Sequence, residues 1–241
     1  MTLAPDTEDR IARHWAERLD CSPEAFSAAG VTVVDTATEG TIRLFRRGDA
    51  LVVAAPGEFH DALADAADEL HAADLPATEA VSCALGGTGI DSVHGPYFLG
   101  YVDEASFSPV ESTARLLVGA DEAAFERLRE RVPDEDWARA SPVFRPGQTA
   151  GLFADGDLVA VATLTHLPFP DVGVVVDPEH RGRGYGRAVV SMITRTAFDV
   201  DRDGIVRYRT RDSLPASVAL AESLGYERWA TSAVLATDQT P

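Results

Sequence analysis

The residues best suited to chemistry lie where an apolar stretch runs into a glycine-rich turn. The segment Val174–Arg187 reads VVVDPEHRGRGYGR, with glycines at 182, 184 and 186 and arginines at 181, 183 and 187. A strand that ends in such a turn and opens a helix points several backbone N–H groups outward, and the helix dipole favours negative charge there. Glycine also lets a ligand approach the backbone closely. The segment therefore predicts a binding site for a phosphate or pyrophosphate.

Two common phosphate-binding loops do not fit this segment. The dinucleotide fingerprint GxGxxG would need glycine at Arg187, and the P-loop needs a lysine, which the chain lacks. What fits is the pattern (Q/R)xxGx(G/A) at Arg181–Gly186, preceded by VxVxP and followed later by the helix end Leu224–Tyr226, which reads LGY. This combination closely resembles the coenzyme A loop of the GNAT superfamily of N-acetyltransferases. The resemblance extends from about Glu111 to the end of the chain, because the order of expected elements also matches.

The resemblance implies a binding site for acetyl-CoA as cosubstrate, without a metal. The backbone of the apolar strand is expected to hydrogen-bond the pantetheine arm, and the turn is expected to hold the pyrophosphate. The residues expected to bind are Val174, Val175, Val176, Arg181, Gly182, Arg183, Gly184, Tyr185, Gly186 and Arg187. In this fold the strands Val172–Val176 and Ile205–Thr210 splay apart, and the thioester is expected in the gap between them.

Catalysis in the family is usually a direct attack of an amine on the thioester carbonyl, helped by a base and an acid. This chain departs from the family pattern, because it has Leu214 and Ala221 where many members have an asparagine and a tyrosine acid. The remaining candidates for proton transfer are Asp171 and His166, which flank the start of the motif strand, and Tyr208 on the facing strand. Each also has a plain structural explanation, as a loop end, a surface turn residue and a core residue.

Two functions from different classes follow from this pattern. The first is an enzyme that acetylates a primary amine, on a small molecule rather than on a protein N-terminus. The acidic composition suits a cationic acceptor such as a polyamine or an aminoglycoside, although adaptation to high salt explains the same charge. The second is a module that binds or senses acyl-CoA without turnover, which the missing asparagine and tyrosine favour.

The elements around the motif follow from local patterns. Asp155-Gly156 is a strong signal for a hairpin turn, and Pro215 and Gly225 suit the first turn and the end of a helix. The expected order is strand Ala114–Val118, helix Glu122–Arg131, a short helix around Trp137, strands Thr149–Ala154, Leu158–Leu164 and Val172–Val176, helix Tyr185–Phe198, strand Ile205–Thr210, helix Pro215–Leu224 and a strand around Arg228–Leu235. We expect an α+β (α/β) fold with a GNAT-like mixed, mostly antiparallel sheet flanked by helices.

The N-terminal part shows no cluster of catalytic residue types. Its patterns predict a helix over Thr7–Phe26, strands at Val31–Val34, Thr41–Phe45 and Leu51–Ala54, a helix through Phe59 and Leu70, a loop over Gly86–Pro96 and a strand at Tyr97–Val102. We expect a smaller α+β domain over residues 1–110 and the GNAT acetyltransferase domain over residues 111–241. The resemblance suggests that the first domain is a divergent GNAT-like unit, which could complete the sheet of the second.

One internal likeness bears on that idea. The stretch Leu44–Ala55 reads LFRRGDALVVAA, and Leu152–Thr163 reads LFADGDLVAVAT. Two ordinary hairpins are the simpler explanation, and a degenerate duplication stays open.

Composition excludes several function classes. The formal net charge of the 241 residues is −18, and all 21 basic residues are arginine. Without lysine there is no Schiff base to pyridoxal phosphate and no lysine general base. So acidic a chain is expected to repel nucleic acid and anionic membranes. Extreme acidity without lysine also indicates adaptation to very high salt, where charge repulsion is screened.

Location and partners are inferred from what the sequence lacks. The apolar runs are too short to span a bilayer, and the acidic N-terminus has no signal pattern, so we expect a cytoplasmic protein. Cys21 and Cys83 lie far apart and have no metal-site spacing. We expect acetyl-CoA and an amine acceptor as partners of a monomer or homodimer.

Overall fold

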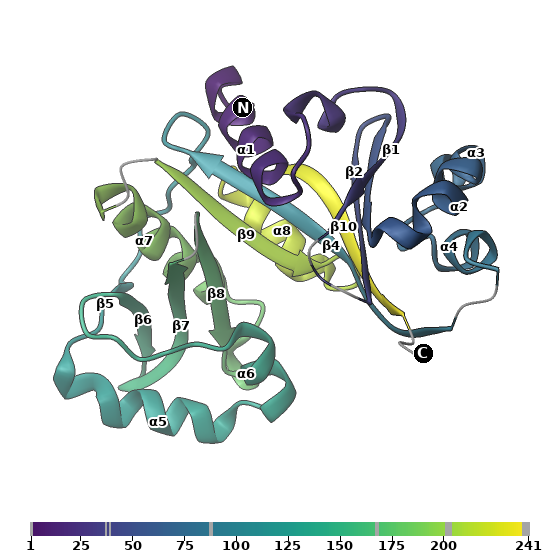
Figure 1. Cartoon of the computed structure of the whole chain (residues 1–241). Helices are drawn as coiled ribbons and strands as arrows, with labels where there is room; N and C mark the ends of the chain where they lie inside the picture. Colours follow the sequence, from purple (N-terminus) through teal and green to yellow (C-terminus); the bar gives the residue numbers. More distant parts are fainter. Residues whose placement is uncertain are drawn as a thin grey trace. The chain divides into compact units, whose positions relative to one another are not determined.

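The computed structural model describes residues 2–36, 38, 40–86, 89–166, 169–200 and 204–237. The chain forms two compact units. Unit 1 consists of Met1–Leu3, Gly100–Arg209 and Ala216–Glu227, and unit 2 of Ala4–Leu99, Thr210–Pro215 and Arg228–Pro241. Both units contain mostly antiparallel strands with helices packed against them (Figure 1), which confirms the expected fold class.

The strands of unit 1 lie in the order β5-β6-β7-β8-β9, followed by β4, part of which belongs to unit 2. Neighbours from β5 to β8 are antiparallel, whereas β8 and β9 are parallel. The β6–β7 turn consists of Asp155 and Gly156, whose φ angles are both positive, as their residue types predict. The strands are β4 Ile90–Asp103, β5 Arg115–Leu116, β6 Thr149–Ala154, β7 Asp157–His166, β8 Pro170–Val176 and β9 Ile205–Arg211.

The helices of unit 1 pack on these strands through apolar faces. Helix α5 buries Phe125 and Leu128 against Val161 and Val175, and α7 packs on β6, β7 and β8. The helical segments are η3 Gly119–Asp121, α5 Glu122–Arg131, α6 Asp134–Ala140, η4 Pro178–His180, α7 Tyr185–Val200 and α8 Pro215–Ser223.

Helices α6 and α7 approach β8 from opposite faces. A Cβ added at Gly173 of β8 would lie 2.5 Å from the Ala140 carbonyl oxygen, at the end of α6. A Cβ added at Gly186 of α7 would instead lie 3.2 Å from the side chain of Val176. Because successive residues of a strand point to opposite faces, positions 173 and 176 mark the two sides of β8.

The strands of unit 2 lie in the order β1-β3-β2-β10-β4. Strand β3 pairs parallel with β1 and antiparallel with β2, which in turn pairs antiparallel with β10. Every residue of β3 is buried. The strands not yet given are β1 Gly30–Asp35, β2 Thr41–Arg47, β3 Ala50–Ala55 and β10 Glu227–Thr237.

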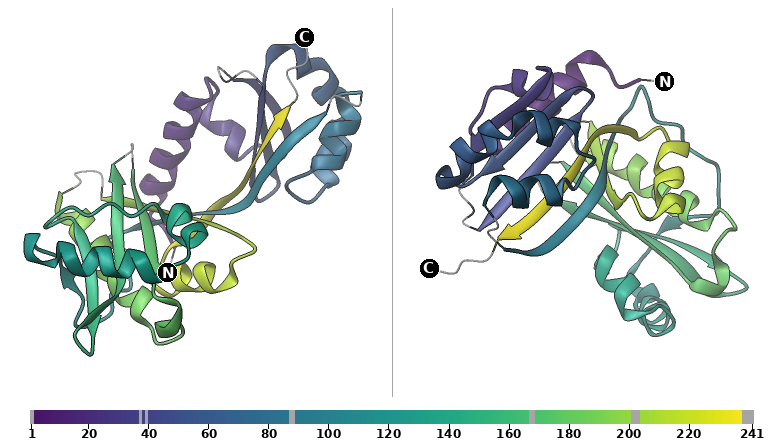
Figure 2. Two further views of the ribbon diagram at one scale, coloured as in Figure 1. Left: turned by 90° about the horizontal axis from the view of Figure 1, so that it is seen from below. Right: turned by 90° about the vertical axis from the view of Figure 1, so that its right-hand side faces the viewer.

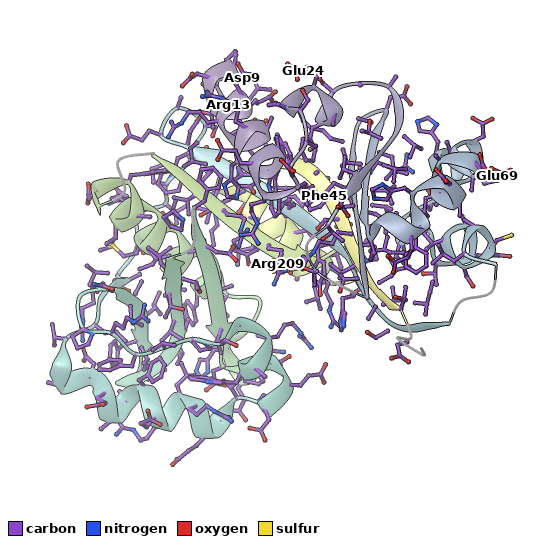
Figure 3. The ribbon with its side chains drawn as sticks, viewed as in Figure 1. Asp9, Arg13, Glu24, Phe45, Glu69 and Arg209 are labelled. Carbon is purple, nitrogen blue, oxygen red and sulfur yellow. The ribbon has the colours of Figure 1, made fainter. Side chains whose placement is uncertain are left out.

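Helices cover both faces of the unit 2 strands (Figures 1 and 2). On one face Leu44 packs in a core with Leu63 and Leu70. On the other face Phe45, labelled in Figure 3, contacts two aromatic rings. The centroid distances are 4.8 Å to Trp15 and 6.0 Å to Phe26. The helical segments are α1 Pro5–Arg18, η1 Pro23–Phe26, η2 Gly57–Phe59, α2 His60–Asp65, α3 Ala67–Ala72 and α4 Thr78–Ala84.

Two helix predictions for unit 2 are wrong in their extent. The helix predicted over Thr7–Phe26 ends at Arg18, because Asp20 takes a positive φ of 48° and a separate short helix follows. The helix predicted through Phe59 and Leu70 is interrupted at Ala66, where φ is −95° and ψ is 20°. Helix α4 was not predicted, since a single buried residue, Val81, carries its apolar pattern.

The loop predicted over Gly86–Pro96 is also wrong in part, because β4 already begins at Ile90. The residue type of Gly95 favours a turn, but in the structure this glycine lets β4 pass close to β10. A Cβ at this position would lie 2.9 Å from the Ser232 carbonyl oxygen of β10. Glycine is needed there by packing, which local sequence does not reveal.

Candidate functional site

A buried carboxylate fixes the start of the turn that follows β8. Asp177 is 3% exposed and caps η4 by accepting a hydrogen bond from the Glu179 amide at 3.0 Å. Arg131 of α5 donates to Asp177 at 2.7 Å and to the Leu158 carbonyl at 2.7 Å. Burial alone would raise the pKa of Asp177, but the hydrogen bonds from Arg131 and the Glu179 amide lower it overall. The turn therefore begins at an ionised carboxylate that is held from both sides.

The glycines of the turn have two different surroundings. Gly182 and Gly184 have positive φ angles of 75° and 79°, and a Cβ added at either would meet nothing within 4 Å. At Gly186 a Cβ would lie 2.9 Å from the side chain of Leu220 and 3.2 Å from that of Val176. The first two glycines leave open space beside the N-terminus of α7, and the third lets α7 pack closely against β8 and α8.

The three arginines of the turn differ in what holds them. Arg181 donates to Asp136 of α6 at 2.7 Å, and this hydrogen bond is the main cause of the lowered pKa of Asp136. Arg187 donates to the Ser223 carbonyl, at the end of α8, at 3.1 Å. Arg183 is exposed and has no ion-pair or hydrogen-bond partner among the residues that the structure describes. Its charge therefore remains available to an anion.

Strands β8 and β9 pair near their beginnings and then part. In the described residues their register joins Asp171 to Arg207, and the rest of β8 has its recorded partners in β7. Backbone N–H and C=O groups on the β9 side of Val174–Val176 thus have no strand partner among the described residues. Such an edge can take up an extended ligand as an added strand.

Two hydroxyl groups lie close together on one side of β9, one from the strand and one from α8. The Tyr208 side chain is 2% exposed, and its hydroxyl lies 2.9 Å from that of Ser217 on α8. Burial raises the pKa of Tyr208 to about 12, against the lowering effect of the Ser217 hydrogen bond. Tyr208 is therefore protonated at neutral pH and can donate a hydrogen bond. Its partner Ser217 is half-buried on α8.

The opposite face holds a buried ion pair. Arg207 donates to Asp171 at 2.9 Å, and the side chains are 13% and 19% exposed. Burial would lower the pKa of Arg207, but Asp171 and a hydrogen bond with Tyr101 raise it overall. Within the part of the chain that the structure describes, Oδ1 of Asp171 and Nε of Arg207 are buried without a hydrogen-bond partner. Each residue of the ion pair therefore has one polar atom that makes no hydrogen bond to a described residue.

The structure brings most of the predicted site residues together. Val174–Val176 form the end of β8, and residues 181–187 follow at once as the turn and the first turn of α7. Asp171 and Tyr208 lie on the parting strands, on opposite faces. His166 ends β7 opposite Pro170, but its side chain lies outside the part of the chain that the structure describes.

Sequence reasoning missed several residues that build the site. Arg131 and Asp136 reach the turn across 46 and 45 residues, so no local pattern indicates them. Ser217 had a usable signal, because it lies three residues after Leu214 and four before Ala221, on the same side of α8.

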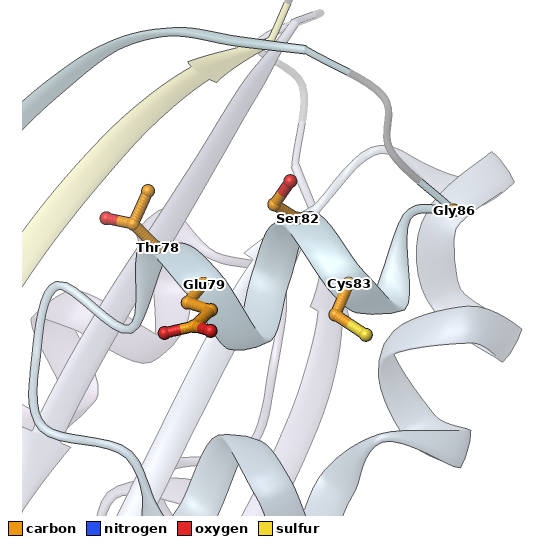
Figure 4. Close-up of a pocket in the computed structure, with 5 residues that line it drawn as sticks. All are labelled: Thr78, Glu79, Ser82, Cys83 and Gly86. Atoms are coloured by element: carbon orange, nitrogen blue, oxygen red, sulfur yellow. The ribbon is translucent and has the colours of Figure 1, made fainter.

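Other parts of the described chain show weaker candidates for a binding site. A shallow hollow beside α4 is lined by Thr78, Glu79, Ser82, Cys83 and Gly86 (Figure 4), a carboxylate, hydroxyls and a thiol without an arginine or histidine among them. Across the described residues, no group of three or more His, Cys, Asp and Glu side chains could hold a metal ion. None of the helices in the same residues combines the length and apolar character needed to cross a membrane.

Three solved structures that are similar to part of this chain are acetyltransferases by their descriptions. A putative GNAT-family acetyltransferase from Novosphingobium aromaticivorans is 23% identical, with a TM-score of 0.46 over 63% of this chain and 68% of that one. A GCN5-related N-acetyltransferase from Kribbella flavida is 24% identical, with a TM-score of 0.48 over 66% of this chain and 64% of that one. A putative acetyltransferase from Salmonella typhimurium, solved with its cofactor acetyl-CoA, is 20% identical, with a TM-score of 0.37 over 55% and 97%.

The family comparison bears directly on the site. No curated protein matches the sequence. Residues 111–226 match the acetyltransferase (GNAT) family, and this range contains β8, the glycine turn, β9 and α8. The resemblance stated from the motif is thereby confirmed as a match to this family over residues 111–226.

Proposed function

We propose that this chain transfers an acetyl group from acetyl-CoA to a primary amine of a small molecule. The observation that carries the proposal is the open glycine turn at the end of an unpaired strand edge, within a GNAT domain. A pyrophosphate needs open backbone amides and a free positive charge. Gly182, Gly184 and Arg183 provide both, so the residues present fit the donor.

Each part of the site has a proposed role in holding the donor. The backbone of Val174, Val175 and Val176 would bind the pantetheine arm as an added strand. The amides from Gly182 to Arg187 would hold the pyrophosphate, with Arg183 adding charge. Arg181 is already bound to Asp136, so we assign it to fixing the turn against α6.

The proposed chemistry places base and acid on opposite faces of the sheet. When bound, acetyl-CoA supplies a thioester carbonyl that an amine can attack. Asp171 has a carboxylate oxygen that no described residue hydrogen-bonds, and we propose that this atom accepts the proton of the amine. His166 remains an alternative base. On the other face, Tyr208 and Ser217 are proposed to donate hydrogen bonds to the departing sulfur.

The family's missing tyrosine is expected to slow this reaction rather than abolish it. A thiol of pKa about 8.5 is already a fair leaving group near neutral pH, and general acid catalysis contributes roughly 10²–10⁴-fold. We expect Tyr208→Phe to lower kcat by about 10-fold to 100-fold, within that range, and to leave the affinity for acetyl-CoA unchanged.

Tyr226→Phe is the matched control for that substitution. Tyr226 is also buried, its ring centroid lies 5.5 Å from that of Tyr208, and its hydroxyl is bound to Thr194 at 2.6 Å. Both variants remove one buried hydroxyl, so both lose stability by a similar mechanism. Equal effects on kcat would contradict a catalytic role for Tyr208.

The second candidate function is a module that binds acyl-CoA without turnover. Leu214 and Ala221, at the positions of the family's asparagine and tyrosine, favour it. The test is release of free thiol from acetyl-CoA in molar KCl, with a panel of primary amines. Amine-dependent thiol release establishes the transferase. Binding of acetyl-CoA without release by any amine would instead establish the module.

A further inference from the structure

His180 lies at the start of the glycine turn and has no part in the chemistry proposed above. It is the last residue of η4, and the four residues from Arg181 to Gly184 separate it from Tyr185, the first residue of α7. The rings of His180 and Tyr185 lie nearly parallel, with 6.4 Å between their centroids and 30° between their planes. The imidazole therefore lies beside the segment that is proposed to hold the donor phosphates.

The two ring nitrogens of His180 have different surroundings. Nδ1 lies 3.6 Å from Oδ1 of Asp177, which is too far for a hydrogen bond, and it is buried without a partner among the described residues. Nε2 likewise makes no hydrogen bond to a described residue, but it is not buried. One nitrogen thus faces a buried carboxylate, and the other reaches solvent.

A protonated ring could satisfy an anion at each nitrogen. Neutral imidazole has one N–H donor and one acceptor, whereas the charged ring has two donors. The charged ring can direct Nδ1–H to Asp177 and Nε2–H to a phosphate oxygen. A neutral ring must leave one of these two anions facing a lone pair. An anionic donor at the turn therefore favours the charged form of His180.

The other groups around the turn keep their charge when histidine titrates. Arg181 lowers the pKa of Asp136. Burial would raise the pKa of Asp177, but Arg131 lowers it overall. The charged and titratable groups that contact η4, the turn or the start of α7 are Asp177, Glu179, Arg131, Asp136, Arg181, Arg183, Tyr185 and Arg187.

Histidine is the side chain whose charge ordinarily changes between about pH 5 and pH 8. Of the histidines whose side chains the structure describes, His180 alone belongs to unit 1. A change in donor affinity over this pH range would therefore point to this ring.

We infer that His180, in its protonated form, is a further residue of the donor site and holds a donor phosphate through Nε2. This inference rests on the proposed function. Asp177 acts through His180 and is a positioning residue, because it orients the ring through Nδ1. Since the charged form binds the donor, the added affinity is present below the titration range of histidine and is lost as pH rises through that range. Binding is accompanied by proton uptake.

The test uses dephospho-CoA, whose pyrophosphate keeps a constant charge over this range. CoA itself carries a 3′-phosphate monoester that titrates at about pH 6, and this would obscure the protonation of the protein. Calorimetric titrations in molar KCl are compared at about pH 5.5 and about pH 8. We expect the native protein to bind dephospho-CoA about 3-fold to 5-fold more tightly at the lower pH, the effect of one partly exposed ion pair.

Variants at position 180 assign the effect to the ring. His180→Gln has no charge and should bind weakly at both pH values, whereas His180→Arg is always charged and should bind tightly at both. His71→Gln is the matched control, because Nε2 of His71 also faces a carboxylate, that of Asp49 at 3.2 Å, but in unit 2. This control should keep the native pH dependence.

A second measurement needs no variant. Calorimetry of the native protein at about pH 6.5, in two buffers of different ionisation enthalpy, gives the number of protons exchanged when dephospho-CoA binds. We expect net uptake of a fraction of a proton. Release of protons, or no exchange, would contradict the inference.

The outcomes separate this inference from the proposed function. If the native protein binds neither CoA nor dephospho-CoA, the proposed function fails and this inference with it. If dephospho-CoA binds equally well at both pH values, or if His180→Gln keeps the native pH dependence, the role of His180 alone is overturned and the donor site stands.

Discussion

Two hairpins of nearly the same residue order lead to very different structures. Leu44–Ala55 forms β2 and β3 in unit 2, and Leu152–Thr163 lies in β6 and β7 of unit 1. Each has a two-residue turn between antiparallel strands. Strand β3 then pairs parallel with β1 and is followed by α2, whereas β7 pairs antiparallel with β8, which leads into the glycine turn.

The difference lies in the strands that each hairpin joins, not in the hairpin itself. In unit 2 every residue of β3 is buried, because helices cover both faces and strands flank both edges. In unit 1, β8 contains both buried and half-buried residues and parts from β9. The flanked strand β3 contributes to a core, whereas β8 has an open edge where it parts from β9, and this edge is where we propose the site. Matched features of the two units allow this contrast to be tested.

Helix-ending glycines should show the largest difference in stability. Gly225 and Gly86 both follow a helix with positive φ, but a Cβ at Gly225 would lie 2.0 Å from the Ser106 carbonyl oxygen, while one at Gly86 would meet nothing within 4 Å. We expect Gly225→Ala to lower the free energy of unfolding by about 3 kcal/mol or more, and Gly86→Ala by about 1 kcal/mol. Urea unfolding in molar KCl measures the free energy of unfolding of both variants. Equal losses would contradict the close contact between Gly225 and Ser106.

Arginine ion pairs should show the next largest difference. Arg131 holds Asp177, whose side chain is 4% exposed, whereas Arg47 holds Glu8, which is 40% exposed. We expect Arg131→Gln to cost about 2 kcal/mol because it leaves a buried carboxylate without its cation, and Arg47→Gln less than about 1 kcal/mol. Arg131→Gln should also weaken binding of acetyl-CoA, since Asp177 caps the segment that leads into the turn. Unchanged affinity would separate the ion pair from the site.

The smallest effect concerns pH. The pKa of Asp121 is lowered to about 2 by hydrogen bonds from Arg115 and from the Val118 amide. A depressed pKa means that the stabilisation is present above the unfolded value of about 3.9 and is lost as pH falls through about 2. The difference in unfolding free energy between the native chain and Asp121→Asn should therefore be full at pH 6 and smaller at pH 3. A difference that does not change with pH would show that the charge of Asp121 contributes nothing.

Much of unit 1 could be predicted because its signals are local. Asp155-Gly156 favours a two-residue turn, and both residues do take positive φ. Gly225 ends α8 with a φ of 91°, as its place after a marked helix indicated. The phosphate site at the glycine turn also follows from residue types alone, and it stays a prediction.

The rest could not be predicted because it depends on contacts between distant segments. Gly95 has the residue type of a turn, but it is placed by the backbone of β10. The bonds from Arg131 to Asp177 and from Arg181 to Asp136 exist only once α5 and α6 have packed on the sheet. The same holds for Tyr208 and Ser217, which meet when α8 covers β9.

The most direct test of the account compares two open glycines. Gly184 in the turn and Gly48 in the β2–β3 hairpin both have positive φ and meet nothing within 4 Å at the Cβ position. Substitution by aspartate strains the backbone equally at both, by about 1–2 kcal/mol. At Gly184 alone, the new carboxylate would also face the bound phosphates. Like charges about 4 Å apart repel by about 4 kcal/mol near a protein surface, less under screening.

Calorimetric titration with acetyl-CoA in molar KCl decides the matter. We expect the native chain and Gly48→Asp to bind alike, and Gly184→Asp to bind about 100-fold more weakly or not at all. Absence of binding by the folded native chain, or equal binding by Gly184→Asp and Gly48→Asp, would contradict the assignment of the turn as the donor site.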